Sequence, residues 1–284
     1  ITMALVTRRV MFVRHGEAGH NIIREFLHRE DNPLTPHGRK QAADINAFLK
    51  RSVTPDAPLH RVITSPMTRA IETALIATQG IAMTPRASTT QPTVCRLVTE
   101  RHLAHGCDSG SPITTMRQRF PHLDFSALAP ERWWYTEEEA VATKIRARDG
   151  MRGFVTAERP PGSSLGEPAA GWGVESGGPF PDSALYKKLL ADRCAGITRY
   201  LSDLPPDEAS VAVFCHGGIL RYLLGRDFEN CDVAEYSWPP PDGVFPQIPS
   251  RTYHGARRVP KEAGADDAVQ SNLAISPRLR LSKL

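Results

Sequence analysis

Three short apolar runs, each ending at a turn with glycine or proline, limit most strongly what this chain can fold into. They lie at residues 10–13, 61–64 and 211–214. Continuous apolar runs of this length, separated by helical stretches, are typical of strands buried on both faces of a parallel sheet. The chain is therefore predicted to be an α/β protein with a mostly parallel central sheet.

The stretches between these runs contain helix start signals followed by apolar residues at helical spacing. A residue that can cap a helix, followed by proline, favours the first turn of a helix. The predicted helices begin at Thr35-Pro36, at Ser65-Pro66, at Thr136 and after Ser183. Thr136 is followed by three glutamates, and that helix is expected to run to about residue 148.

Two segments predict irregular structure. Residues 153–182 contain seven glycines and five prolines, which favours a long loop or insertion without a core of its own. From Trp238 onward a proline run opens a segment with little apolar periodicity. We expect a domain over residues 1–236 and an extended or disordered basic tail over 237–284.

The formal net charge of +4 belongs to the tail. Residues 251–284 hold seven basic and three acidic residues, so the 35 basic and 31 acidic residues of the whole chain leave 28 of each for residues 1–250. A neutral body argues against a nucleic-acid or membrane partner, because both need a broad basic surface. The chain also lacks an apolar run of the roughly 18–20 residues that a membrane span requires. No secretory signal is recognisable at the start. Five scattered cysteines without a CxxC pattern favour reduced thiols.

Each predicted strand is followed by residues suited to phosphate chemistry. Arg14 and His15 follow the first, Ser65 and Arg69 the second, and His216 the third. Binding sites of open α/β sheets form beyond the carboxyl ends of the strands, so these segments are expected to converge. Guanidinium groups match phosphate oxygens, and the amides of a helix opening at Ser65-Pro66 would add to the attraction. Together they predict a phosphate-sized cationic pocket.

These motifs resemble the histidine phosphatase superfamily, the phosphoglycerate mutase-like proteins. Residues 14–17 match its Arg-His-Gly-Glu motif, and Asn21 fits the asparagine that follows. Residues 31–38, 65–74 and 216–218 resemble its later blocks, so that the resemblance covers roughly residues 10–226. It implies a three-layer α/β/α sandwich, mostly parallel, with a cap or insertion.

The residue types indicate the chemistry. A neutral His15 can attack phosphorus, and Arg14, Arg69 and His216 would stabilise the charge on the transferring group. These side chains take the role that a metal has elsewhere, so we expect neither metal nor cofactor. The resemblance implies Glu100 as the proton donor.

Several assignments have alternatives. Asp108 or Glu131 could replace Glu100 as the acid. Asn21 could contact the phosphate, as Gly217 is expected to do, or only form a turn. Glu17 and Thr35 are interpreted as a supporting carboxylate and a helix cap.

Two side-chain groups invite other interpretations. His102, His105 and Cys107 imitate a metal cluster but are interpreted as loop residues. Trp133 and Trp134 are interpreted as core packing rather than as a wall of the substrate pocket.

The predicted function is hydrolysis of a phosphorylated small molecule through a phosphohistidine on His15. A mutase would use the same histidine, but the tyrosine-glycine continuation of the mutase block is missing after Glu100-Arg101-His102. Residues 107–110, 120–125 and 131–133 look more like a phosphatase branch. A second alternative is a member that binds phosphorylated ligands without turnover; the filled catalytic positions speak against it.

The last three residues are Ser282-Lys283-Leu284. A C-terminal Ser-Lys-Leu is an address read by the peroxisomal import receptor. The sequence therefore predicts delivery to the peroxisome or a related organelle such as the glycosome, and otherwise a cytoplasmic location.

Overall fold

The structure is a computed structural model in which a defined part of the chain is described. The described residues are 7–54, 56–81, 83, 91–103, 105–128, 131–148, 184–239 and 252–255. They fall within one compact unit, Ile1–Thr156 with Phe180–Ala256.

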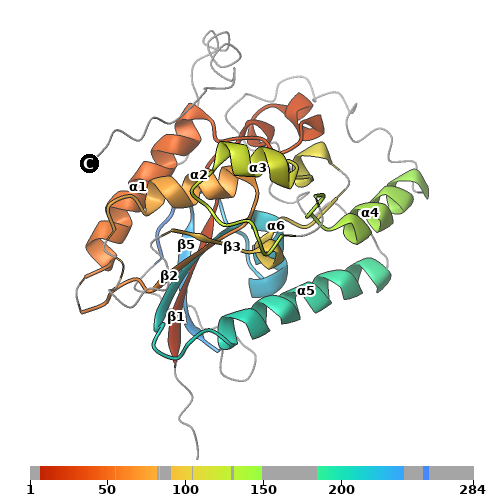
Figure 1. The fold of residues 1–284 in the computed structure, drawn as a ribbon. Helices are drawn as coiled ribbons and strands as arrows, with labels where there is room; N and C mark the ends of the chain where they lie inside the picture. The colour runs from red at the N-terminus through yellow and green to blue at the C-terminus, as the bar shows by residue number, and fades with distance from the viewer. Residues whose placement is uncertain are drawn as a thin grey trace, which may run out of the picture. The chain divides into compact units, whose positions relative to one another are not determined.

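The centre of this unit is a five-stranded, mostly parallel sheet (Figure 1). Its strands are β1 Arg8–Arg14, β2 Arg61–Thr64, β3 Thr93–Val94, β4 Ser210–Cys215 and β5 Val233–Trp238. The order across the sheet is β3-β2-β4-β1-β5, and only β5 runs antiparallel to its neighbour. The three predicted strands are confirmed as β1, β2 and β4, whereas β3 and β5 were not predicted.

Helices cover both faces of the sheet (Figure 1). The helices are α1 Pro36–Ser52, α2 Thr68–Ala77, α3 Ile113–Arg119, α4 Thr136–Arg148, α5 Ala184–Ser202 and α6 Gly217–Leu224. Alternate residues of β1 point to opposite faces, as strand geometry requires. Met11 and Val13 pack with α1 and α2, whereas Val10 and Phe12 pack with α5 and α6. The predicted three-layer α/β/α architecture is thus confirmed.

Three of the four predicted helix starts are confirmed, those of α1, α4 and α5, whereas the predicted start of α2 is wrong. Thr35 caps α1 by accepting a hydrogen bond from the Gly38 N–H at 3.0 Å. The helix expected at Ser65-Pro66 begins three residues later, at Thr68. The Ser65 hydroxyl instead accepts the Met67 N–H at 3.3 Å, and Asp31 accepts the Thr68 N–H at 2.7 Å. Ser65-Pro66 therefore forms a turn, and a carboxylate already occupies the Thr68 amide that was expected to attract phosphate.

The domain reaches beyond the predicted boundary at residue 236. Ser237 and Trp238 belong to β5, and Tyr253 pairs with Val233. The Trp238 side chain is fully buried, which explains why the strand continues. The whole of the predicted insertion, 153–182, lies outside the described residues, as does most of the tail with its Ser-Lys-Leu ending. The peroxisomal address therefore stays a prediction. No helix within the described ranges is long and apolar enough to cross a membrane.

Candidate active site

Sheet register brings the three chemical segments together. In the parallel ladders Arg14 is paired with Cys215, and Thr64 with Phe214, so β1, β2 and β4 end at the same edge. Backbone hydrogen bonds continue one residue further, because the His15 N–H donates to the Cys215 carbonyl at 3.0 Å. His15 and His216 therefore leave the sheet side by side, with ring centroids 5.0 Å apart.

The His15 ring is held in an orientation that suits nucleophilic attack. Its Nδ1 lies 2.7 Å from the Gly16 carbonyl oxygen, which can only accept, so Nδ1 carries the hydrogen. Its Nε2 accepts the Arg69 Nε–H at 3.2 Å and therefore presents a lone pair. Arg69 is itself fixed by donating to the Cys107 carbonyl at 3.0 Å. The geometry leaves a neutral imidazole with Nε2 as its basic atom.

Electrostatics keep the histidines of this site uncharged. Burial, followed by the nearby charge of Arg69, lowers the pKa of His15 well below 6.5. The same two causes lower the pKa of His216 and of His20, although Asp108 partly opposes the shift at His20. At neutral pH all three imidazoles are consequently available as lone-pair or N–H groups rather than as cations.

Acid is therefore expected to destabilise the fold. In the unfolded chain each imidazole takes up a proton near pH 6.5, whereas in the folded protein the pKa of His15, His20 and His216 lies well below that value. As the pH falls below 6.5, the unfolded state binds more protons than the folded state. The free energy of unfolding should then decrease by up to about 1.4 kcal/mol per pH unit for each histidine. Urea unfolding across this pH range measures the effect.

A His20→Asn variant provides the matched comparison for this pH dependence. It removes one of the three buried imidazoles, so its free energy of unfolding should fall less steeply below pH 6.5 than that of the unchanged protein. Identical slopes for the two proteins would contradict the assignment of His20 as a buried neutral group.

Three buried nitrogens of the site have no hydrogen-bond partner among the described residues. They are Arg14 Nε, His20 Nδ1 and His216 Nδ1. Buried polar groups are normally satisfied, and such nitrogens are donors or potential donors suited to an anion. Arg14 and His216 thus have nitrogens that could contact a phosphoryl group, and His20 has another; the predicted phosphate contacts, including that of Arg69, stay predictions.

Glycines 217 and 218 allow two charged side chains to approach the start of α6. A Cβ at Gly217 would lie 3.2 Å from the Arg14 guanidinium carbon, and one at Gly218 only 2.4 Å from Glu100 Oε1. The Glu100 carboxylate accepts N–H groups from Gly218 at 3.1 Å and Ile219 at 3.0 Å. Glu100 thus lies at the N-terminus of α6, within one turn of His216.

The two alternative acids lie in different surroundings. Glu131 is exposed and bonds Thr114, with its Oε1 2.6 Å from the Thr114 hydroxyl. Asp108 is buried, and burial by itself would raise its pKa. The hydrogen bond with His105 and the charge of His105 nevertheless hold the pKa of Asp108 well below the usual range. The Glu100 carboxylate lies beside the start of α6, next to His216, so its position makes Glu100 the strongest candidate of the three.

Asn21 has a structural contact in addition to its predicted role. Its Oδ1 accepts the Ala18 N–H at 2.9 Å, which closes the short 3₁₀ turn Gly19–Asn21. The turn function is therefore present, and the phosphate contact, which would use the side-chain amide hydrogens, stays a prediction. Glu17 and Thr35 have the predicted supporting roles, because the Thr35 hydroxyl donates to Glu17 Oε1 at 2.6 Å while also capping α1.

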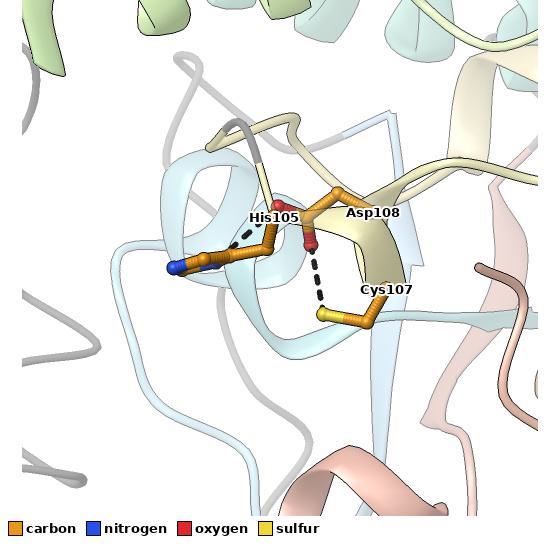
Figure 2. A group of neighbouring side chains, drawn as sticks. All are labelled: His105, Cys107 and Asp108. Carbon is orange, nitrogen blue, oxygen red and sulfur yellow. Dashed lines mark hydrogen bonds and ion pairs between the residues drawn. The ribbon is translucent and has the colours of Figure 1, made fainter. Parts of the chain in front are cut away.

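The turn around Cys107 groups three side chains of types that can bind a metal ion. The ligand atoms of His105, Cys107 and Asp108 lie within 4.8 Å of one another (Figure 2). Asp108 accepts from the Cys107 thiol at 3.7 Å and pairs with His105 Nδ1 at 3.6 Å. These mutual contacts hold the turn that offers the Cys107 carbonyl to Arg69. His102, the third residue named from the sequence, instead bonds the Ser109 hydroxyl at 3.1 Å.

His20 is the site residue that sequence reasoning missed. Its ring centroid lies 6.0 Å from that of His15, and its side chain is buried. Its position in the sequence could have indicated this role, because His20 lies between the Arg-His-Gly-Glu motif and Asn21, one residue before Asn21. Trp133 and Trp134 are both buried in an apolar cluster that includes α3 residues, which confirms the core-packing interpretation.

Comparison with known proteins identifies the class. The family model of the histidine phosphatase superfamily (branch 1) matches residues 10–158, more than half of the chain. The chain therefore belongs to the histidine phosphatase superfamily.

A relative from Schizosaccharomyces pombe, named "Probable phosphatase", is 28% identical over 135 residues. The match covers 43% of this chain and 54% of that protein, so the chain spans about half the length of the relative.

Solved structures with similar folds are more distant. A phosphoserine phosphatase mutant from Entamoeba histolytica is 14% identical with a TM-score of 0.43, covering 84% of this chain and 94% of that one. The phosphoglycerate mutase from Thermus thermophilus is 20% identical with a TM-score of 0.38, covering 84% and 95%.

Proposed function

We propose that the protein is a metal-independent phosphomonoester hydrolase that acts through a phosphohistidine on His15. The observation that supports this most strongly is the His15 ring itself. Its Nδ1 hydrogen is tied to the Gly16 carbonyl, and its Nε2 lone pair lies against Arg69. A neutral imidazole in this orientation is the nucleophile that phosphoryl transfer to histidine requires.

The reaction proceeds in two steps on these residues. The Nε2 lone pair of His15 attacks phosphorus while the bond to the leaving oxygen breaks and protonated Glu100 gives that oxygen a proton. Water then attacks the phosphohistidine, Glu100 takes the water proton, and the N–P bond breaks to release phosphate. Arg14, Arg69 and His216 stabilise charge on the phosphoryl oxygens in both transition states.

Hydrolysis is favoured over a mutase reaction by the segments that resemble phosphatases. Residues from 120–125 and 131–133 build the apolar cluster that also holds Met67, two residues before Arg69. The name of the S. pombe relative points in the same direction. We propose a phosphorylated small molecule as the substrate class.

Leaving-group dependence tests the role of Glu100. A Glu100→Gln variant should lose about 10²–10³-fold in kcat/KM for an alkyl phosphate, whose leaving oxygen needs a proton. For p-nitrophenyl phosphate, whose leaving group departs without one, the loss should be about tenfold or less. The parameter kcat/KM isolates transfer to His15 from the later hydrolysis.

Equal losses on both substrates would exclude Glu100 as the acid. Asp203→Asn is a suitable control, because Asp203 is an exposed carboxylate at the end of α5. Failure of the unchanged protein to release phosphate from either substrate would contradict the proposed hydrolase activity itself.

A further inference from the structure

The segment that presents Glu100 has no regular secondary structure of its own. Residues 99–103 are neither helix nor strand, and yet Thr99, Arg101 and His102 are buried. A general acid must be placed to within a fraction of an ångström, and loop segments seldom supply such precision unaided. Contacts from elsewhere in the fold are needed to fix the Glu100 backbone.

Arg193, from the middle of α5, supplies the central contact. Its Nη1 donates to the Thr99 carbonyl at 3.2 Å and to the Glu100 carbonyl at 3.3 Å. One guanidinium nitrogen therefore holds the carbonyl groups on both sides of the Glu100 N–Cα unit. Lysine could not reproduce this contact together with the others that Arg193 makes, because it lacks the planar fork.

A buried acidic partner holds Arg193 in turn. Glu138, from the first turn of α4, lies with its Oε1 3.2 Å from Arg193 Nε, and both side chains are only 1% exposed. The other carboxylate oxygen of Glu138 accepts the His102 N–H at 3.1 Å. Glu138 thus both balances the Arg193 charge and fixes the backbone two residues after Glu100.

Two aromatic residues complete the arrangement. The Tyr186 hydroxyl, also from α5, donates to the His102 carbonyl at 2.8 Å. The Tyr135 ring lies 4.3 Å from the Arg193 guanidinium carbon, a distance at which cations are attracted to aromatic faces. Three side chains from α4 and α5 consequently converge on one short piece of backbone, and Tyr135 packs against one of them, Arg193.

We infer that Arg193, Glu138 and Tyr186 are positioning residues. Together they align Glu100 with the leaving-group oxygen. The inference rests on the proposed hydrolase function. Burying the pair removes two charges from water, which costs free energy that their mutual attraction often fails to recover. Its contacts to the backbone around Glu100 give it a role beyond joining α4 to α5.

The test is again the dependence on the leaving group, now in an Arg193→Lys variant. Misplaced Glu100 should lower kcat/KM for an alkyl phosphate about tenfold more than for p-nitrophenyl phosphate, because only the first needs protonation. A variant that is merely less folded contains fewer active molecules, so its apparent kcat/KM should fall by the same factor for both substrates. Arg199→Lys, the same change at an exposed position of α5, should leave both values unchanged.

Tyr186→Phe keeps the inference falsifiable if Arg193→Lys does not fold. It removes only the hydroxyl that holds the His102 carbonyl and should show the same selectivity with a smaller loss. Equal losses on both substrates in whichever variant folds would overturn the inference. If Glu100→Gln loses more kcat/KM on the alkyl phosphate than on p-nitrophenyl phosphate and these variants do not, the hydrolase proposal is supported and the positioning role is excluded.

Discussion

Replacing His15 by alanine should reduce kcat/KM for phosphomonoester hydrolysis by on the order of 10⁴–10⁶-fold, the range seen when a covalent nucleophile is removed. The reason is structural as well as chemical. His15 Nε2 is the one lone pair that Arg69 and the Gly16 carbonyl jointly orient in this site. Among the described histidines, His15 alone has this pair of contacts.

A rapid-quench experiment with a ³²P-labelled phosphomonoester measures the same step directly. The unchanged protein should acquire acid-labile, alkali-stable label, as expected of a phosphohistidine, and His15→Ala should acquire none. His122→Ala, at an exposed position, serves as the control for a lost histidine. Full activity in His15→Ala, or label of the same stability, would exclude His15 as the nucleophile.

The convergence of the site was predictable because it depends on local patterns. Each apolar run ends where its strand ends, and parallel strands of one sheet end at the same edge. That argument is sufficient to place Arg14, His15 and His216 together without knowing any long-range contact.

Features that depend on distant partners were not predictable in this way. The start of α2 was misplaced because the cap comes from Asp31, thirty-seven residues earlier than Thr68. Strand β5 mixes polar and apolar residues and is defined by its antiparallel pairing with β1 at the edge of the sheet. Strand β3 has only two residues, too few to show a period.

Arg193 shows the same limit within the functional machinery. In the sequence it is one charged residue in an amphipathic helix, where a charge normally lies in solvent. Its burial depends on its partner Glu138 in α4, and thirty-five residues outside the described ranges separate α4 from α5. Neither the sequence of α4 nor that of α5 alone indicates that Glu138 and Arg193 form a buried pair.

Arg69 is expected to produce the second large effect, and two substitutions separate its two functions. Arg69→Lys retains a positive charge but loses the fork that contacts both His15 and Cys107. It should reduce kcat/KM by about 10²–10³-fold, the usual effect of removing an aligned transition-state donor. Vanadate, which mimics the transition state, should lose affinity by a similar factor, whereas inorganic phosphate should lose much less.

Arg69→Met removes the charge as well and should therefore change the pH dependence. After burial, the Arg69 charge is the largest influence that lowers the pKa of His15. Without it the pKa of His15 rises, so the acid limb of the kcat/KM profile should move to higher pH in Arg69→Met but not in Arg69→Lys. Arg117→Lys, at an exposed site on α3, should change neither quantity. An unshifted acid limb in Arg69→Met would show that Arg69 does not govern protonation of the nucleophile, and its contribution would then be confined to the phosphoryl oxygens.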